Sequence, residues 1–115
     1  MTNEENEENL IKSQALYGYS HYIYGEAYFG SCRGMRFRVA REPLEDVRFA
    51  PAEKQQEGQF MVTVWPEPLS YEKAPEDIKK SFYFPFTEQG RLDAIACLNE
   101  QYRSGKADWD KVRSV

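Results

Sequence analysis

The sequence predicts one small α+β domain: an antiparallel meander sheet of three to five strands, with helices from the N- and C-terminal parts of the chain packed on one face. Three observations lead to this fold class. The chain has 115 residues, which suits one domain with one core. Three segments alternate with the period of a strand, and no helix long enough for a parallel crossover lies between them. A segment with helical spacing follows the last of these strands.

The last predicted strand and the helix after it are the clearest part of the pattern. Phe82, Phe84 and Phe86 alternate with Tyr83 and Pro85, which predicts a strand with one fully apolar face. The apolar side chains that follow fall on one side of a helix, and they are Leu92, Ile95, Leu98 and Tyr102.

The two ends of this helix also carry recognisable residues. Thr87 is a suitable N-cap, and Gly105 lies where a C-terminal cap is expected. Gly90 stands in the first turn, where it costs about 1 kcal/mol relative to alanine. Free N–H groups at this position can hold an anion, but Glu88 would repel it. We therefore interpret Gly90 as relieving crowding against a strand.

Two earlier segments complete the predicted sheet. Met35, Phe37 and Val39 alternate with Arg36 and Arg38, which gives a strand with one apolar and one basic face. The segment 60–65 is apolar on both faces, which predicts either a central position in the sheet or a covered outer face. Between them, the segment 42–58 is expected to be a long loop. A helical turn is expected at 75–80 and a last short one after Asp108.

The N-terminal part is less regular. Residues 1–8 are predicted to be a disordered acidic tail, and residues 9–115 to form the domain. Apolar residues between Leu10 and Leu16 have approximate helical spacing and predict a helix over about residues 4–17. Between Tyr19 and Phe29 we expect a short strand and then an aromatic loop, although the same residues could also prolong the first helix.

The charges argue against a strong non-specific nucleic-acid binder. Four of the 19 acidic residues lie in the tail, and the remaining 15 balance the 15 lysines and arginines. A neutral body lacks the basic excess of such proteins. The basic residues are nevertheless unevenly distributed, because five arginines fall within 16 residues: Arg33, Arg36, Arg38, Arg41 and Arg48.

The sequence also favours a cytoplasmic protein. No secretory signal and no apolar run long enough to span a membrane are visible, so no membrane association is expected. Cys32 and Cys97 are far apart in the sequence and are read as free thiols in a reducing compartment.

No catalytic constellation stands out. His21 is the only histidine, and its neighbourhood contains no nucleophile motif. One histidine and two distant cysteines do not make a zinc site, and Asp108 with Asp110 lacks the rest of a calcium loop. We therefore expect no metal and no cofactor, and the sequence leans against an enzyme. An enzyme stays the third reading, with a pocket lined by tyrosines: Tyr17, Tyr19, Tyr22, Tyr24 and Tyr28.

The most informative feature is the face of the sheet opposite the phenylalanines. Its predicted members combine arginine with apolar and aromatic groups, and they are Arg36, Arg38, Met61, Thr63, Trp65 and Tyr83. This composition is typical of protein interfaces. We therefore predict a non-enzymatic protein-interaction module, which contacts a partner or a second copy of itself through this face. A single-stranded nucleic-acid-binding module using the same face is the alternative. An open structural alternative is that the segment 19–29 or the long loop covers the face as ordinary core.

Overall fold

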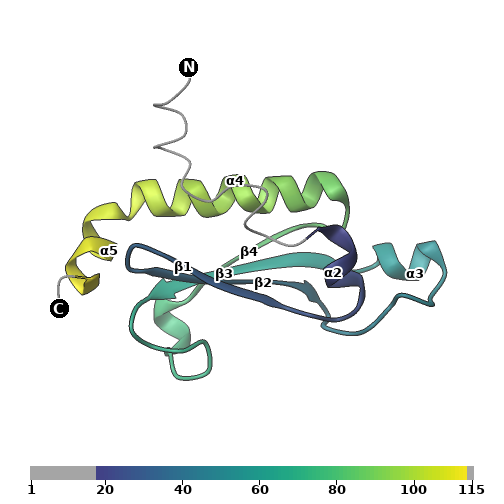
Figure 1. Ribbon diagram of the computed structural model, residues 1–115, viewed down its shortest axis with the longest axis horizontal. Coiled ribbons are helices and arrows are strands. Elements are labelled where there is room, and N and C mark those ends of the chain that lie inside the picture. The colour runs from purple at the N-terminus through teal and green to yellow at the C-terminus, as the bar shows by residue number, and fades with distance from the viewer. Residues whose placement is uncertain (1–17, 114–115) are drawn as a thin grey trace, which may run out of the picture.

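The computed structural model describes residues 18–113 and confirms a small α+β domain with a four-stranded antiparallel meander, in the order β1-β2-β3-β4. Helix α4 lies along one face of the sheet, and the connection from β3 to β4 lies on the other (Figure 1). The elements are α2 (Tyr19–Ile23), β1 (Tyr28–Cys32), β2 (Met35–Glu42), α3 (Ala52–Gln56), β3 (Gln59–Pro66), the 3₁₀ helix η2 (Glu76–Ile78), β4 (Lys80–Pro85), α4 (Glu88–Ser104) and α5 (Lys106–Arg113).

The two central strands, β2 and β3, contribute many of the buried side chains of the core. β2 and β3 pair from Met35 opposite Pro66 to Glu42 opposite Gln59, and the central position predicted for the segment 60–65 is confirmed. Because side chains alternate across a strand, one parity of residues faces α4. These side chains are all buried, and they are Met35, Phe37, Val39, Phe60, Val62 and Val64.

The N-terminal side of the sheet differs from the sequence prediction. Where a short strand was expected, Tyr19–Ile23 forms the helix α2, and Gly25 with a φ of 83° follows it. The buried Tyr22 ring packs edge-on against Phe60 with centroids 5.2 Å apart. A five-residue helix is too short to show a helical period, so the alternation of tyrosines was misleading. The first strand, β1, comes instead from Tyr28–Cys32.

Helix α4 begins as predicted. The backbone N–H of Gly90 donates to Thr87 Oγ1 at 3.0 Å, so Thr87 is the N-cap. A Cβ on Gly90 would overlap the carbonyl oxygen of Pro85. Gly90 therefore lets α4 approach the end of β4, which supports the interpretation that it relieves crowding against a strand.

Gly90→Ala is expected to destabilise the protein by about 1–3 kcal/mol, because the added methyl pushes α4 away from Pro85. Helix propensity alone would give the opposite sign, a gain of about 1 kcal/mol. Urea denaturation measures the difference. Gly18→Ala is the control, since a Cβ there meets nothing within 4 Å. A Gly90→Ala variant more stable than wild type would contradict the close approach.

The C-terminal end continues into a second helix. Gly105 is the C-cap of α4, as predicted, and α5 follows directly. Asp108 lies in the first turn of α5 and so does not start a separate turn. Trp109 Nε1–H donates to the carbonyl of Gln101 at 3.1 Å, which holds α5 against the end of α4.

Some predictions fall outside the described residues. The acidic tail 1–8 and the helix expected over about residues 4–17 lie there. Within residues 18–113, no helix has the length and apolar character needed to cross a bilayer.

Candidate binding face

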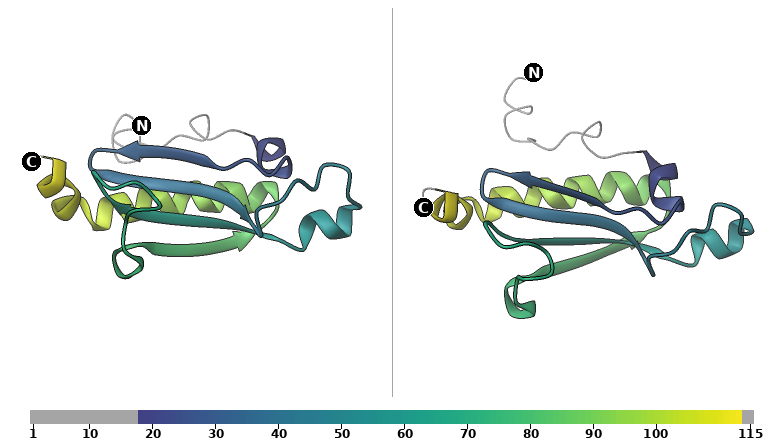
Figure 2. Two further views of the ribbon diagram at one scale, coloured as in Figure 1. Left: turned by 90° about the horizontal axis from the view of Figure 1, so that it is seen from below. Right: turned by 60° about the horizontal axis from the view of Figure 1, so that its bottom comes forward.

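The predicted contact residues share one face of the sheet. Arg36 lies opposite Trp65, and Arg38 lies opposite Thr63. One row further along, Met61 lies opposite Tyr83. All of these residues have the parity that points away from α4, and we call the surface they form the outer face. In both views of Figure 2 the sheet lies in front of α4, so its outer face is turned toward the reader.

The connection from β3 to β4 covers part of this outer face. Trp65 is 2% exposed, and its Nε1–H donates to the carbonyl of Leu69 at 2.7 Å. The ring of Tyr71 lies 5.5 Å from that of Trp65. Neither segment that the sequence suggested as a cover, 19–29 or 42–58, makes these contacts. Trp65 is therefore second-layer core beneath the segment 66–79.

Arg38 is also covered, and it has unusual surroundings. The residue is 8% exposed, and its guanidinium carbon lies 4.9 Å from the ring centroid of Tyr71 and 6.0 Å from that of Phe29. Lys79 Nζ lies 4.2 Å from the Tyr71 centroid. Cation–π contact stabilises the guanidinium. Within residues 18–113, no carboxylate or hydrogen-bond acceptor pairs with the Arg38 side chain.

The open part of the face lies on both sides of this cover. Tyr83 is 51% exposed on β4, and Met61 beside it is half-buried. On β1, Phe29 is 54% exposed and lies opposite Arg38. Phe29 is absent from the predicted face, because the sequence pattern predicts an aromatic loop there. The only signal was that Phe29 and Ser31 share a parity on either side of Gly30.

A pocket of about 480 Å³ opens on the outer face beside β1. Four aromatic residues, an arginine and a carboxylate line it together with small and polar groups, and the residues are Phe29, Gly30, Ser31, Arg36, Phe37, Trp65, Ser70, Tyr71 and Glu72. The half-buried Arg36 makes no side-chain hydrogen bond, ion pair or ring contact with any residue in the described range 18–113. Its five N–H donors are therefore available to a ligand.

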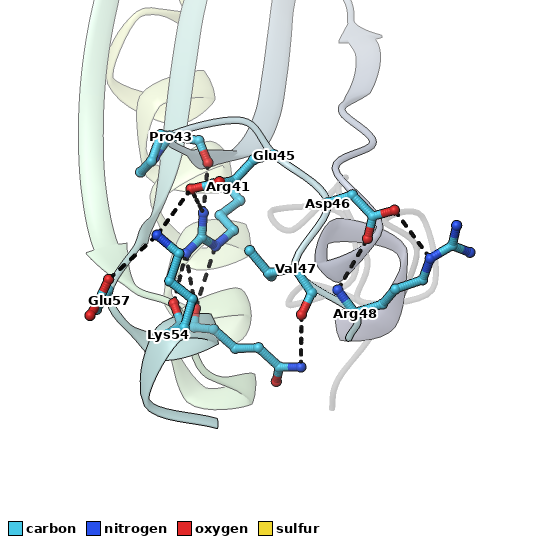
Figure 3. Close-up of polar contacts among 9 residues, drawn as sticks. Arg41, Pro43, Glu45, Asp46, Val47, Arg48, Lys54 and Glu57 are labelled. Carbon is cyan, nitrogen blue, oxygen red and sulfur yellow. Dashed lines mark hydrogen bonds and ion pairs between the residues drawn. The ribbon is translucent and has the colours of Figure 1, made fainter. Parts of the chain in front are cut away.

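Arg41 has a different role from its neighbours in the sequence. It is 1% exposed, and its guanidinium donates to the carbonyls of Pro43 at 2.8 Å and Lys54 at 3.1 Å (Figure 3). It also pairs with Glu45 at 3.3 Å. Arg41 thus holds the segment 42–58 in place. The prediction of a loop throughout this segment is wrong at Ala52–Gln56, which forms the helix α3. Arg48 points away from this network and pairs with Asp46.

The tyrosines proposed for an aromatic pocket are not gathered in one place. Tyr22 is core, Tyr24 is half-exposed beside Arg48, and Tyr28 packs on Phe37. None of these three lines the pocket beside β1. Tyr17 lies outside the described residues, and the Tyr19 side chain is likewise not described.

The histidine and the two cysteines do not form a reactive site with other described residues. His21 Nε2 lies 3.3 Å from the carbonyl of Ala27. Burial and the nearby Glu100 raise the pKa of Cys97 to about 11, and burial raises the pKa of Cys32 against the opposing charge of Arg33. Both thiols therefore stay protonated at neutral pH and are poor nucleophiles. Among residues 18–113, no three His, Cys, Asp or Glu side chains are grouped so as to hold a metal.

Comparison with known proteins gave no relative: no family model, no curated protein and no solved structure matches the chain.

Proposed function

We propose that this protein is a non-enzymatic protein-interaction module, and that it binds an extended segment of a partner along β1 and the pocket beside it. The observation that carries the proposal is Arg36, which lies in an aromatic pocket and has no partner among residues 18–113. Arginine and aromatic side chains in a recess are the composition of interface hot spots.

The strand β1 supports an extended partner. Among the described strands β1 pairs only with β2, so along residues 29–32 no described strand occupies its other edge. The opposite edge strand, β4, carries Lys80 and Pro85, which discourage pairing. β1 contains no charged residue and no proline. An added strand gains affinity from the backbone, and adjacent pockets give specificity for its side chains.

Peptide selection tests this proposal. We expect a displayed library of random peptides to yield ligands of the full chain. Arg36→Glu should weaken their binding at least about tenfold, because a hot-spot arginine contributes about 2 kcal/mol or more. Fluorescence anisotropy with labelled peptides measures the affinity. Arg33→Glu is the matched control, since Arg33 is exposed and does not line the pocket, and it should change the affinity by no more than about twofold.

Three results would contradict the proposal. The first is that no peptide is enriched. The second is that Arg36→Glu and Arg33→Glu weaken binding equally, which would indicate general charge attraction without use of the pocket. The third is that the Arg36→Glu variant unfolds, although the Arg36 side chain makes no hydrogen bond, ion pair or ring contact with residues 18–113. A melting curve of each variant reports the third result separately.

A second copy of the chain is one candidate partner, because an edge strand and exposed rings such as those of Phe29 and Tyr83 can pair across a two-fold axis. Sedimentation of the wild type across concentrations, compared with Arg36→Glu, detects it. An unchanged monomer leaves a different protein as the partner.

Single-stranded nucleic acid is the second candidate, favoured by the rings of Phe29 and Tyr71 beside two arginines. It demands binding to a single-stranded oligonucleotide whose affinity falls steeply with salt and is lost in Arg36→Glu. That result would replace the protein partner. The neutral charge of the chain outside the acidic tail favours the protein.

A further inference from the structure

We infer that the pocket beside β1 recognises a carboxylate next to an aromatic ring, so that the partner's segment presents an aromatic residue beside an acidic group. This inference rests on the proposed function and names the chemistry that the same pocket selects. It depends on three features of the outer face: two arginines that have no counterion in the described part of the chain, the arrangement of the rings and the charge balance.

Two arginines at the pocket favour the binding of an anion. Arg36 lines the pocket, and Arg38 lies in the next row of the sheet, in contact with two of the rings that line it. Arg38 is more than nine-tenths buried, and within residues 18–113 its guanidinium contacts only the rings of Phe29 and Tyr71. Burying a charge without a counterion is costly, so a bound anion in the adjacent pocket would lower the free energy of both guanidinium groups.

The rings supply the apolar half of the site. The Tyr71 centroid lies 5.5 Å from that of Trp65 and 6.3 Å from that of Phe29. The three neighbouring rings are inclined to one another, and all three residues line the pocket. Ring pairs at such distances favour tilted or edge-on contact. A further aromatic ring finds apolar surface here, while the Ser31 and Ser70 hydroxyls and Arg36 offer donors at the same opening.

The charge balance favours a monoanion. Glu72 also lines the pocket and offsets one of the two arginines. Lys79, the other cation near the rings, is held by Glu76 at 3.0 Å. A carboxylate matches the single positive charge that is left, whereas a phosphate monoester brings nearly two negative charges at neutral pH.

Small probes test the inference independently of any partner. Titration of the isotope-labelled full chain by NMR compares N-acetylphenylalanine, which has a ring and a carboxylate, with its neutral amide. We expect the acid to bind at least about tenfold more tightly, because a charge-assisted bond to a guanidinium is lost in the amide. The shifts should centre on the backbone of Gly30 and Ser31 and on the Trp65 indole N–H.

Variants separate the pocket from general attraction. Arg36→Gln should abolish the preference for the acid, Arg36→Lys should keep part of it, and Arg33→Gln should leave it unchanged. Equal binding of acid and amide, or no binding in the millimolar range, would overturn the inference. Tighter binding of phenyl phosphate would replace the carboxylate with a phosphate, and tighter binding of uridine monophosphate would replace it with a nucleotide.

The two proposals fail in different ways. If selected peptides need Arg36 but acid and amide bind equally, the carboxylate is wrong and the interaction module stands. If no peptide is selected while the acid binds in the pocket, the partner's segment is wrong and the pocket belongs to a free small molecule.

Discussion

Phe60→Ala is expected to destabilise the fold by about 3–5 kcal/mol, the cost of removing a large buried ring and leaving a cavity. Phe60 is fully buried on the central strand β3. Its ring lies 5.2 Å from that of Tyr22 and 4.8 Å from that of Phe86, so it joins α2, the sheet and the connection from β4 to α4. Urea denaturation measures the loss, which is a large share of the stability of a small domain.

Phe49→Ala is the matched control, since it removes the same side chain from a residue that is 91% exposed. We expect it to change stability by less than about 0.5 kcal/mol. Similar losses in the two variants would show that the ring of Phe60 is not in the core. Phe84→Ala should lie between them, because β4 is an edge strand and leaves Phe84 half-buried.

Arg41→Ala is expected to lower the free energy of unfolding by about 2–4 kcal/mol. We expect the segment 42–58 to unfold locally while the sheet stays folded. The substitution removes a buried charged donor from the carbonyls of Pro43, Lys54 and Gln55. The lost carbonyl partners include those at the C-terminal end of α3, where a cation is favourable. A Cβ on Gly58 would lie 2.7 Å from Arg41 Cζ, so the chain is also shaped around this guanidinium.

Hydrogen exchange together with urea denaturation measures the effect. The amides of α3 should lose protection in Arg41→Ala while those of β2 and β3 keep theirs. Arg48→Ala is the control, because the Arg48–Asp46 pair is exposed and worth little. Unchanged exchange in α3 would contradict the anchoring role of Arg41.

The parts of the fold that the sequence predicts are those with long, regular periods. β2 and β3 each have eight residues, and α4 has seventeen, so alternation and helical spacing are visible. β1, α2 and α3 have only five residues each. For the two helices this is less than two turns, which is too short for a helical period to be visible. Gly30 at the centre of β1 further weakens the signal of a strand. Their structure depends on tertiary contacts such as that between Tyr22 and Phe60.

The candidate face shows the same division. Parity along β2 and β3 correctly places Arg36, Arg38 and Trp65 on one face. Whether each is open depends on the path of the segment 66–79, which has no period. The contact of Tyr71 with Trp65 and Arg38 closes over two residues that the sequence presents as equivalent to Arg36. Charge reversal at Arg38 would therefore disturb the fold, and Arg36 is the cleaner test of binding.

The turn between β1 and β2 is held from behind by the C-terminal helix. A Cβ on Gly34 would overlap the carbonyl of Trp109, and the Gly34 carbonyl accepts from the N–H of Glu67 at 2.9 Å. The tip of the hairpin that carries Phe29 and Arg36 thus packs closely against α5 and is hydrogen-bonded to the start of the covering segment. A partner that docks on such a preorganised hairpin loses little conformational entropy in the protein, so more of its contact energy is kept as affinity.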